Sequence, residues 1–162
     1  MTRYAEKTDV PAERSRGEIE TLLRRYGATG FLSGWSDGRA HVGFEMSGRR
    51  LKFVMKVPEP SEKRFTTFNR GRGGGEAKRS TDAAYRLWEQ ASRQIWRALL
   101  LVIKAKLEAV DAGISIFDDE FLAHIVMPDG RTVAEHVREP LKLAYGSGKV
   151  APLLPDYREH KQ

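Results

Sequence analysis

The stretch RAHVGFEMSGRRLKFVMKV (39–57) decides the fold. Apolar and polar residues alternate on both sides of Ser47-Gly48, which is typical of two antiparallel strands joined by a tight turn. One face of this hairpin collects the apolar residues Ala40, Val42, Phe44, Met46, Leu51, Phe53, Met55 and Val57. The pattern predicts strands over Arg39–Met46 and Arg49–Val57 that bury one face.

A third strand precedes the hairpin. Thr29–Trp35 leads into the turn Ser36-Asp37-Gly38, so we expect a three-stranded antiparallel meander that ends at Pro58. Phe31 and Trp35 lie on one side of this first strand and Leu32 lies on the other. The sequence leaves open which side faces the core.

Helices are expected before and after the meander in the sequence. Ser15 and Glu18 have the spacing of a capping box, which predicts a helix from Ser15 to Gly27. A long helix is expected from Ser80 or Thr81 to about Ala112, and at 1.5 Å per residue it would be about 48 Å long. Such a helix bends, protrudes or packs on a second subunit. Because the residues around Leu99–Ile103 are apolar on all sides, the sequence predicts a homodimer through them.

The last third of the chain is mixed. We expect a short helix over Ile116–Ala123 capped by Ser115, and a short strand over His124–Met127. Thr132 and Glu135 form a second capping box, which predicts a helix that runs to Tyr145 and is kinked or split at Pro140.

Together these elements predict one α+β domain over 1–162, with a helix, a three-stranded antiparallel meander, a long central helix and a small C-terminal helical and turn region. Residues 1–14 are expected to be an arm, and residues 147–162 an extended tail. Residues 61–79 hold three consecutive glycines and are expected to form a flexible basic Gly-rich loop.

The composition narrows the function. The 162 residues hold 28 Lys and Arg against 22 Asp and Glu, and a net charge of +6 favours a polyanionic partner such as nucleic acid. The absence of cysteine excludes disulfides, thiolate catalysis and cysteine-based zinc sites. The apolar run 98–103 is too short to cross a bilayer, and residues 1–10 lack the apolar run of a signal peptide, so we expect a cytoplasmic protein without membrane association.

The outward face of the meander is the first candidate for nucleic-acid binding. If Phe31 and Trp35 face outward, they lie beside Arg50, Lys52 and Lys56, which is the composition of a platform that stacks bases and holds phosphates. The alternative is that both aromatic rings belong to the core and the cations are simply solvated.

Two other groups of cations are further candidates. Arg70 and Arg72 lie in the Gly-rich loop and resemble arginine-glycine tracts that bind nucleic acid, although a flexible linker has the same composition. On the long helix, a basic stripe combines Arg86, Arg93, Arg97 and Lys104. It suits a phosphate backbone, but it is also the ordinary wet side of an amphipathic helix.

The sequence offers no constellation typical of an enzyme. The histidines lack a metal-binding spacing, and no nucleophile motif or phosphate-binding loop is present. The acidic run Asp118-Asp119-Glu120 suits a helix start better than a metal site. We therefore expect a non-enzyme without catalytic residues, metal or cofactor.

Four stretches resemble a family of uncharacterised proteins encoded by phages and prophages. They are SRGEIETLLRRYGATGF (15–31), FEMSGRRLKF (44–53), WRALLLVIKAKLEAVDAGISIFDDEFLAHIVMPDG (96–130) and LLP (153–155). The resemblance implies an accessory role inside a bacterial cell and brings no known activity. Our hypothesis from the sequence is a phage accessory protein that binds nucleic acid, with single-stranded DNA or RNA favoured and little sequence specificity. The alternative is a protein-binding module that inhibits or recruits a host factor.

Overall fold

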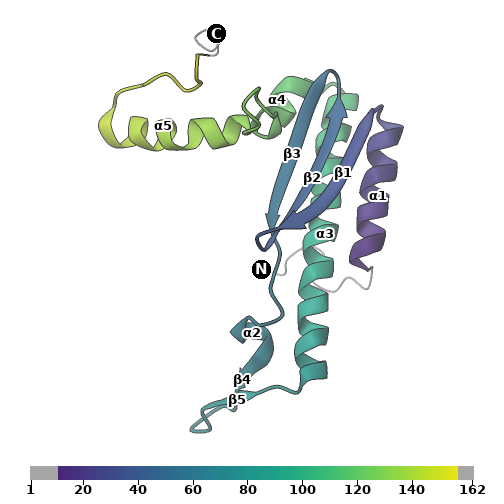
Figure 1. The fold of residues 1–162 in the computed structure, drawn as a ribbon, viewed down its shortest axis with the longest axis vertical. Coiled ribbons are helices and arrows are strands. Elements are labelled where there is room, and N and C mark those ends of the chain that lie inside the picture. Colours follow the sequence, from purple (N-terminus) through teal and green to yellow (C-terminus); the bar gives the residue numbers. More distant parts are fainter. Residues whose placement is uncertain (1–10, 157–162) are drawn as a thin grey trace.

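The computed structural model, which describes residues 11–156, contains the expected antiparallel meander and is an α+β fold (Figure 1). The strands are β1 (Gly30–Ser36), β2 (Arg39–Met46) and β3 (Arg49–Lys56), paired in the order β1-β2-β3. Two-residue turns join them at Asp37-Gly38 and Ser47-Gly48, and all four turn residues have positive φ. Such turns match the right-handed twist of the strands and fix their register.

Helices α1 (Ala12–Arg25) and α3 (Thr81–Asp111) cover one face of this sheet (Figure 1). They and the sheet enclose a core whose fully buried residues include Ile19, Leu23, Val42, Leu51, Ile103 and Phe121. The apolar face predicted for the hairpin is therefore confirmed, although Met55 and Val57 near its end are only half-buried.

The start of α1 differs from the prediction. The helix begins at Ala12 after Pro11, so Ser15 lies inside it rather than at its cap. Proline has no N–H that a helix start would leave unpaired, so the helix can begin directly after Pro11, which is its N-cap residue. Ser15 is buried, and its Oγ has no hydrogen-bond partner among the described residues. Glu18 instead pairs with Arg14 and Arg97.

Helix α3 begins and ends as predicted. The Ser80 side chain accepts a hydrogen bond from the N–H of Ala83, and Gly113 follows the last turn at a φ of +68°. Its 31 residues give a length of about 46 Å, and its first turns extend beyond the sheet (Figure 1). Within Leu99–Ile103, only Val102 is exposed, at 47%. The sheet and α1 therefore cover most of the patch behind the predicted homodimer, which removes the observation that motivated it.

The segment predicted as a flexible loop contains a helix and two strands, so the expectation of a loop is wrong, while its flexibility stays a prediction. It contains α2 (Lys63–Thr66) and the antiparallel strands β4 (Thr67–Asn69) and β5 (Glu76–Lys78). Phe65 and Ala77 are buried. The glycines serve a tight turn, since Gly71, Gly73 and Gly75 all have positive φ. Glycine is the residue that adopts these backbone angles most readily.

The C-terminal part begins with α4 (Phe117–Phe121) and the 3-10 turn η1 (Leu122–His124). Ser115 does not cap α4, because Ile116 occupies the N-cap position. The predicted strand over 124–127 is reduced to two isolated bridges, which join Ile125 to Leu51 and Val126 to Thr132.

Helix α5 (Val133–Ser147) follows, and its predicted capping box is confirmed. Pro140 lies inside α5 without splitting it. The helix projects away from the sheet, and the chain runs on from it without helix or strand over 148–156 (Figure 1). Residues 1–10 of the predicted arm and 157–162 of the predicted tail lie outside the described residues. None of the helices in the described range 11–156 is long and apolar enough to span a membrane.

Candidate nucleic-acid interface

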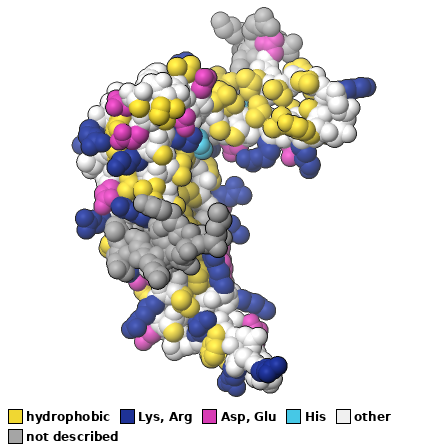
Figure 2. All heavy atoms as spheres, turned by 180° about the vertical axis from the view of Figure 1, so that it is seen from behind, with side chains coloured by type: hydrophobic (Ala, Val, Ile, Leu, Met, Phe, Trp, Pro, Cys, Tyr) yellow, Lys and Arg dark blue, Asp and Glu magenta, His cyan; other side chains and the backbone are white. Residues whose placement is uncertain are grey.

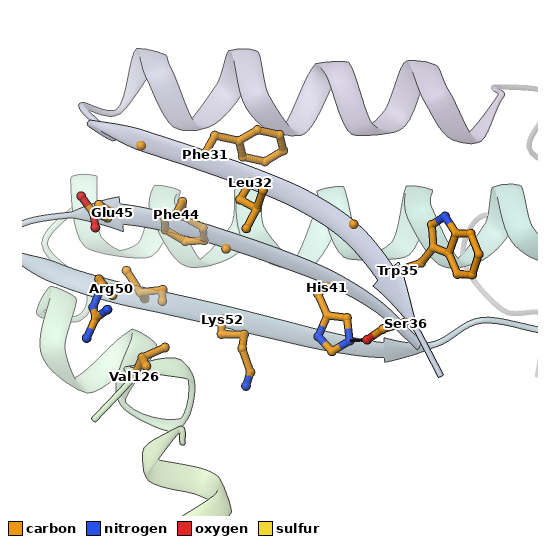
Figure 3. A pocket seen from close by; sticks show the side chains of 14 residues that line it. Phe31, Leu32, Trp35, Ser36, His41, Phe44, Glu45, Arg50, Lys52 and Val126 are labelled. Atoms are coloured by element: carbon orange, nitrogen blue, oxygen red, sulfur yellow. Dashed lines mark hydrogen bonds between the residues drawn. The ribbon is translucent and has the colours of Figure 1, made fainter. Parts of the chain in front are cut away.

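We call the side of the sheet that faces away from α1 and α3 the open sheet face. Three glycines, Gly30, Gly34 and Gly43, lie on it and expose the backbone. They floor a hollow of about 530 Å³, which is also lined by Leu32, Trp35, His41, Arg50 and Lys52 (Figure 3). The hollow is broad and shallow, so a flat group can approach the strands closely.

The two aromatic residues of β1, Phe31 and Trp35, differ in exposure. Phe31 pairs with Phe44 across β1 and β2, faces the helices and is half-buried. Trp35 lies next to the last residue of β1, and it is 84% exposed. The core interpretation therefore holds for Phe31. Trp35 lies across from Ala40 and so has the same strand parity as Phe31, and its exposed indole lines the edge of the hollow at the end of β1, turned away from Lys52 (Figure 3).

A second hollow of about 320 Å³ adjoins the first and shares Lys52 with it. We call it the basic corner, because Arg39, Lys52 and Lys56 of the sheet meet Arg138 of α5 there. Arg39 and Lys56 are direct cross-strand partners. Like charges placed opposite each other destabilise a sheet, and an anion bound between Arg39 and Lys56 would reduce the repulsion between their positive charges.

Among the described residues that line the basic corner, Glu135 is the one carboxylate. The backbone N–H of Thr132 donates to Glu135 Oε2 at 2.6 Å, and this hydrogen bond lowers the pKa of Glu135. The group therefore stays charged at neutral pH. Lys52 Nζ lies 3.9 Å from the same oxygen, a loose ion pair that leaves Lys52 able to bind another anion. Four cations thus face one carboxylate.

Arg50 is a weaker member of the interface. It is exposed and lines the first hollow, but its cross-strand partner is Glu45. An acid directly opposite offsets part of its attraction for a phosphate.

The structure does not bring the other predicted cations to this interface. On α3, Arg97 Nη1 donates to Glu18 Oε2 at 2.7 Å, and Arg93 pairs with Glu89 at 2.8 Å. Arg86 and Lys104 are exposed, but α3 lies on the opposite side of the sheet. Two of the four residues of the predicted stripe are therefore paired with carboxylates within the chain.

Arg70 and Arg72 lie at the turn between β4 and β5, at the opposite end of the molecule from α5 (Figure 1). Both arginines are exposed, but they form a surface that is separate from the open sheet face.

Sequence reasoning missed Arg39 and Arg138. The alternation that placed Ala40 and Val42 on the buried face also assigns Arg39 to the open face, so the signal was present. Arg138 had no comparable signal, because its position depends on how α5 meets β3.

No group of three or more residues suited to hold a metal ion occurs within the described chain. No protein-family model, curated protein or solved structure matches the sequence. The resemblance to phage-encoded proteins therefore stays a prediction.

Proposed function

We propose that this protein binds single-stranded nucleic acid across the open sheet face. One observation carries the proposal: a hollow with an exposed indole shares Lys52 with a corner where four cations face one carboxylate. The setting we propose, on the strength of the sequence resemblance, is an accessory role in the cytoplasm of an infected bacterium.

The geometry supports different roles for the two hollows, with phosphates in one and a base in the other. Phosphates would follow the basic corner, where Arg39, Lys56 and Arg138 have no ion pair among the described residues. A base would stack on Trp35, and such stacking contributes about 1–3 kcal/mol per base. Stacking on a side chain requires an unpaired base, which favours a single strand over a duplex.

Little in the first hollow would read a base sequence. Its floor is glycine backbone, and the side chains of Ser36 and His41 already contact each other at 3.1 Å. Binding through phosphates and stacking should therefore be weakly sequence-specific and strongly dependent on salt.

Fluorescence anisotropy with labelled single-stranded DNA and RNA across a salt series tests the proposal. Replacing Arg39, Lys56 and Arg138 by Ala should reduce the slope of log K against log salt by about 2, since each phosphate contact to a single strand contributes about 0.7. Trp35→Ala should weaken binding by about 5- to 150-fold, the equivalent of one stacked base, with little change in slope.

The matched control is Arg25→Ala with Lys104→Ala, which removes two exposed cations from the helical side of the sheet. We expect it to bind almost as the wild type does. The proposal is wrong if the wild type binds no single strand at low salt, or if the control lowers the slope as much as the basic-corner variant.

A protein partner is the second candidate, and α5 favours it. Val133 at its start is buried, whereas Leu141, Leu143 and Tyr145 are exposed, the last by 88%. Figure 2 shows apolar side chains gathered over α5 and the segment that follows it. If this surface binds a protein, Leu143→Glu with Tyr145→Glu should abolish recovery of a stoichiometric partner from bacterial extract, and Trp35→Ala should not.

A further inference from the structure

We propose that the turn between β4 and β5 is a second nucleic-acid contact that takes a duplex, so that the preferred substrate is a single strand joined to a duplex. The substrate class rests on the proposed function of the open sheet face; the contact itself is argued independently. We call residues 69–76 the hairpin tip.

The hairpin tip has a defined conformation. The N–H of Arg70 donates to the carbonyl of Gly75 at 3.0 Å, and the N–H of Gly74 donates to that of Gly71 at 3.1 Å. The Asn69 side chain accepts from the N–H of Gly71. At Gly74 a Cβ would lie 2.6 Å from the Cβ of Arg70, so the turn requires glycine there. The tip therefore presents its arginines at little entropic cost on binding.

The tip carries two arginines against one carboxylate, Glu76. Arg70 and Arg72 are exposed, and neither has an ion pair among the described residues. The nearby carboxylates are otherwise engaged: Glu76 Oε1 accepts from the Thr67 hydroxyl at 2.7 Å, and Glu62 Oε2 pairs with Arg64 at 2.7 Å.

The aromatic rings of this region lie below the hairpin tip and not in it. Phe65 is buried, and the Arg64 guanidinium lies 4.5 Å from its ring centroid. Phe68 in β4 is 39% exposed, and the Arg79 guanidinium lies 5.3 Å from its ring centroid. Because residues 69–76 include no aromatic side chain on which a base could stack, the tip suits phosphates and groove edges.

The shape of the tip matches a duplex. The major groove admits a two-stranded β-ribbon, and a narrow minor groove attracts arginine. The strands β4 and β5 are three residues each, and Arg70 and Arg72 stand at their end. This is the arrangement that lets two guanidinium groups enter a groove ahead of the ribbon.

The two contacts are far enough apart for two parts of one substrate. The hairpin leads into the first turn of α3 at Thr81, and the sheet packs on α3 around Leu100. At 1.5 Å per residue these points are about 28 Å apart along the helix. That is a little less than one duplex turn of about 34 Å. A single strand that leaves a duplex held at the tip can therefore reach the open sheet face over a distance shorter than one duplex turn.

Anisotropy with three DNAs tests the inference: a single strand of roughly 20 nucleotides, a blunt duplex of roughly 20 base pairs, and that duplex with the single strand as a tail. We expect the tailed duplex to bind at least about tenfold more tightly than either part, because the second contact becomes intramolecular. Arg70→Ala with Arg72→Ala should remove this gain and leave the affinity for the single strand unchanged. The salt slope for the tailed duplex should fall by about 1.8, from two lost phosphate contacts.

The control variant is again Arg25→Ala with Lys104→Ala, which should keep the gain. The inference is overturned if the tailed duplex binds no better than the single strand, or if the tip variant weakens both DNAs equally. If the wild type binds no single strand but binds the duplex through Arg70 and Arg72, the proposed function fails and the tip remains a duplex contact. Arg72→Glu, at an exposed position, repeats the test should the double variant be poorly folded.

Discussion

Gly34→Val should stabilise the fold and weaken binding at the same time. Gly34 lies in the middle of β1 with no atom within 4 Å of where a Cβ would stand, and its φ is not in the left-handed region. Packing and backbone conformation therefore do not require glycine. A β-branched residue suits a strand better by up to about 1 kcal/mol, which would raise the melting temperature by about 2–4 °C in a chain of this size. The new side chain would also stand in the floor of the hollow and hinder a base from lying on the strands there.

The assay pairs thermal unfolding with anisotropy on the single strand. Gly17→Ala is the matched control, because Gly17 in α1 also has open space around it and its replacement should stabilise a helix by up to about 1 kcal/mol. The control should raise the melting temperature and leave binding unchanged. If Gly34→Val binds the single strand as tightly as the wild type, the hollow is not where the strand binds, and the reasoning that made it the interface is refuted.

Four other substitutions test the fold. Thr132→Val should loosen α5 by about 1 kcal/mol through loss of its cap, seen as roughly fivefold faster amide exchange in α5 with α3 unaffected; a matching acceleration in α3 would show that α5 unfolds with the core. Phe121→Ala should cost about 3–5 kcal/mol, measured by urea unfolding, because the side chain is fully buried; a loss under 1 kcal/mol would contradict its place in the core. Gly74→Ala should open the hairpin tip by pushing Arg70 aside, with changed amide shifts over 69–76, whereas an unchanged spectrum would disprove the required turn. Burial lowers the pKa of His124, so the unfolded chain takes up a proton near pH 6.5 that the folded chain resists. The contribution of neutral His124 to the free energy of unfolding is therefore complete above that pH and is lost as pH falls through the folded pKa. His124→Phe should flatten the dependence of the free energy of unfolding on pH in this range.

The elements that local pattern decides were predictable from sequence. The alternation and glycine turns of 39–57 gave β2 with its observed bounds and β3 to within one residue. The Ser80 and Thr132 caps located the starts of α3 and α5, since a capping side chain acts within four residues of itself. Ser15 met the same rule and failed, because Pro11 offered an earlier helix start.

The candidate site was predictable only in part, since it depends on contacts between distant segments. Lys52 and Lys56 followed from strand parity. Whether Trp35 is exposed depends on what packs against the end of β1, and no local pattern encodes those contacts. The basic corner depends on α5 meeting β3 through Thr132 and its neighbours, about 80 residues further along the chain.

The location of the excess positive charge follows from where the fold places its acids. On α1 and α3, carboxylates lie one turn from arginines or face them across the helix pair, so Arg93 and Arg97 are matched within the chain. A strand has no such one-turn neighbour, so residues on its exposed face meet cross-strand partners or, as Lys52 meets Glu135, residues of another element. For Arg39 that partner is Lys56 rather than an acid. Net charge therefore overstates how many cations can bind, and cations on the sheet and the hairpin tip are better placed than those on the helices to bind a polyanion.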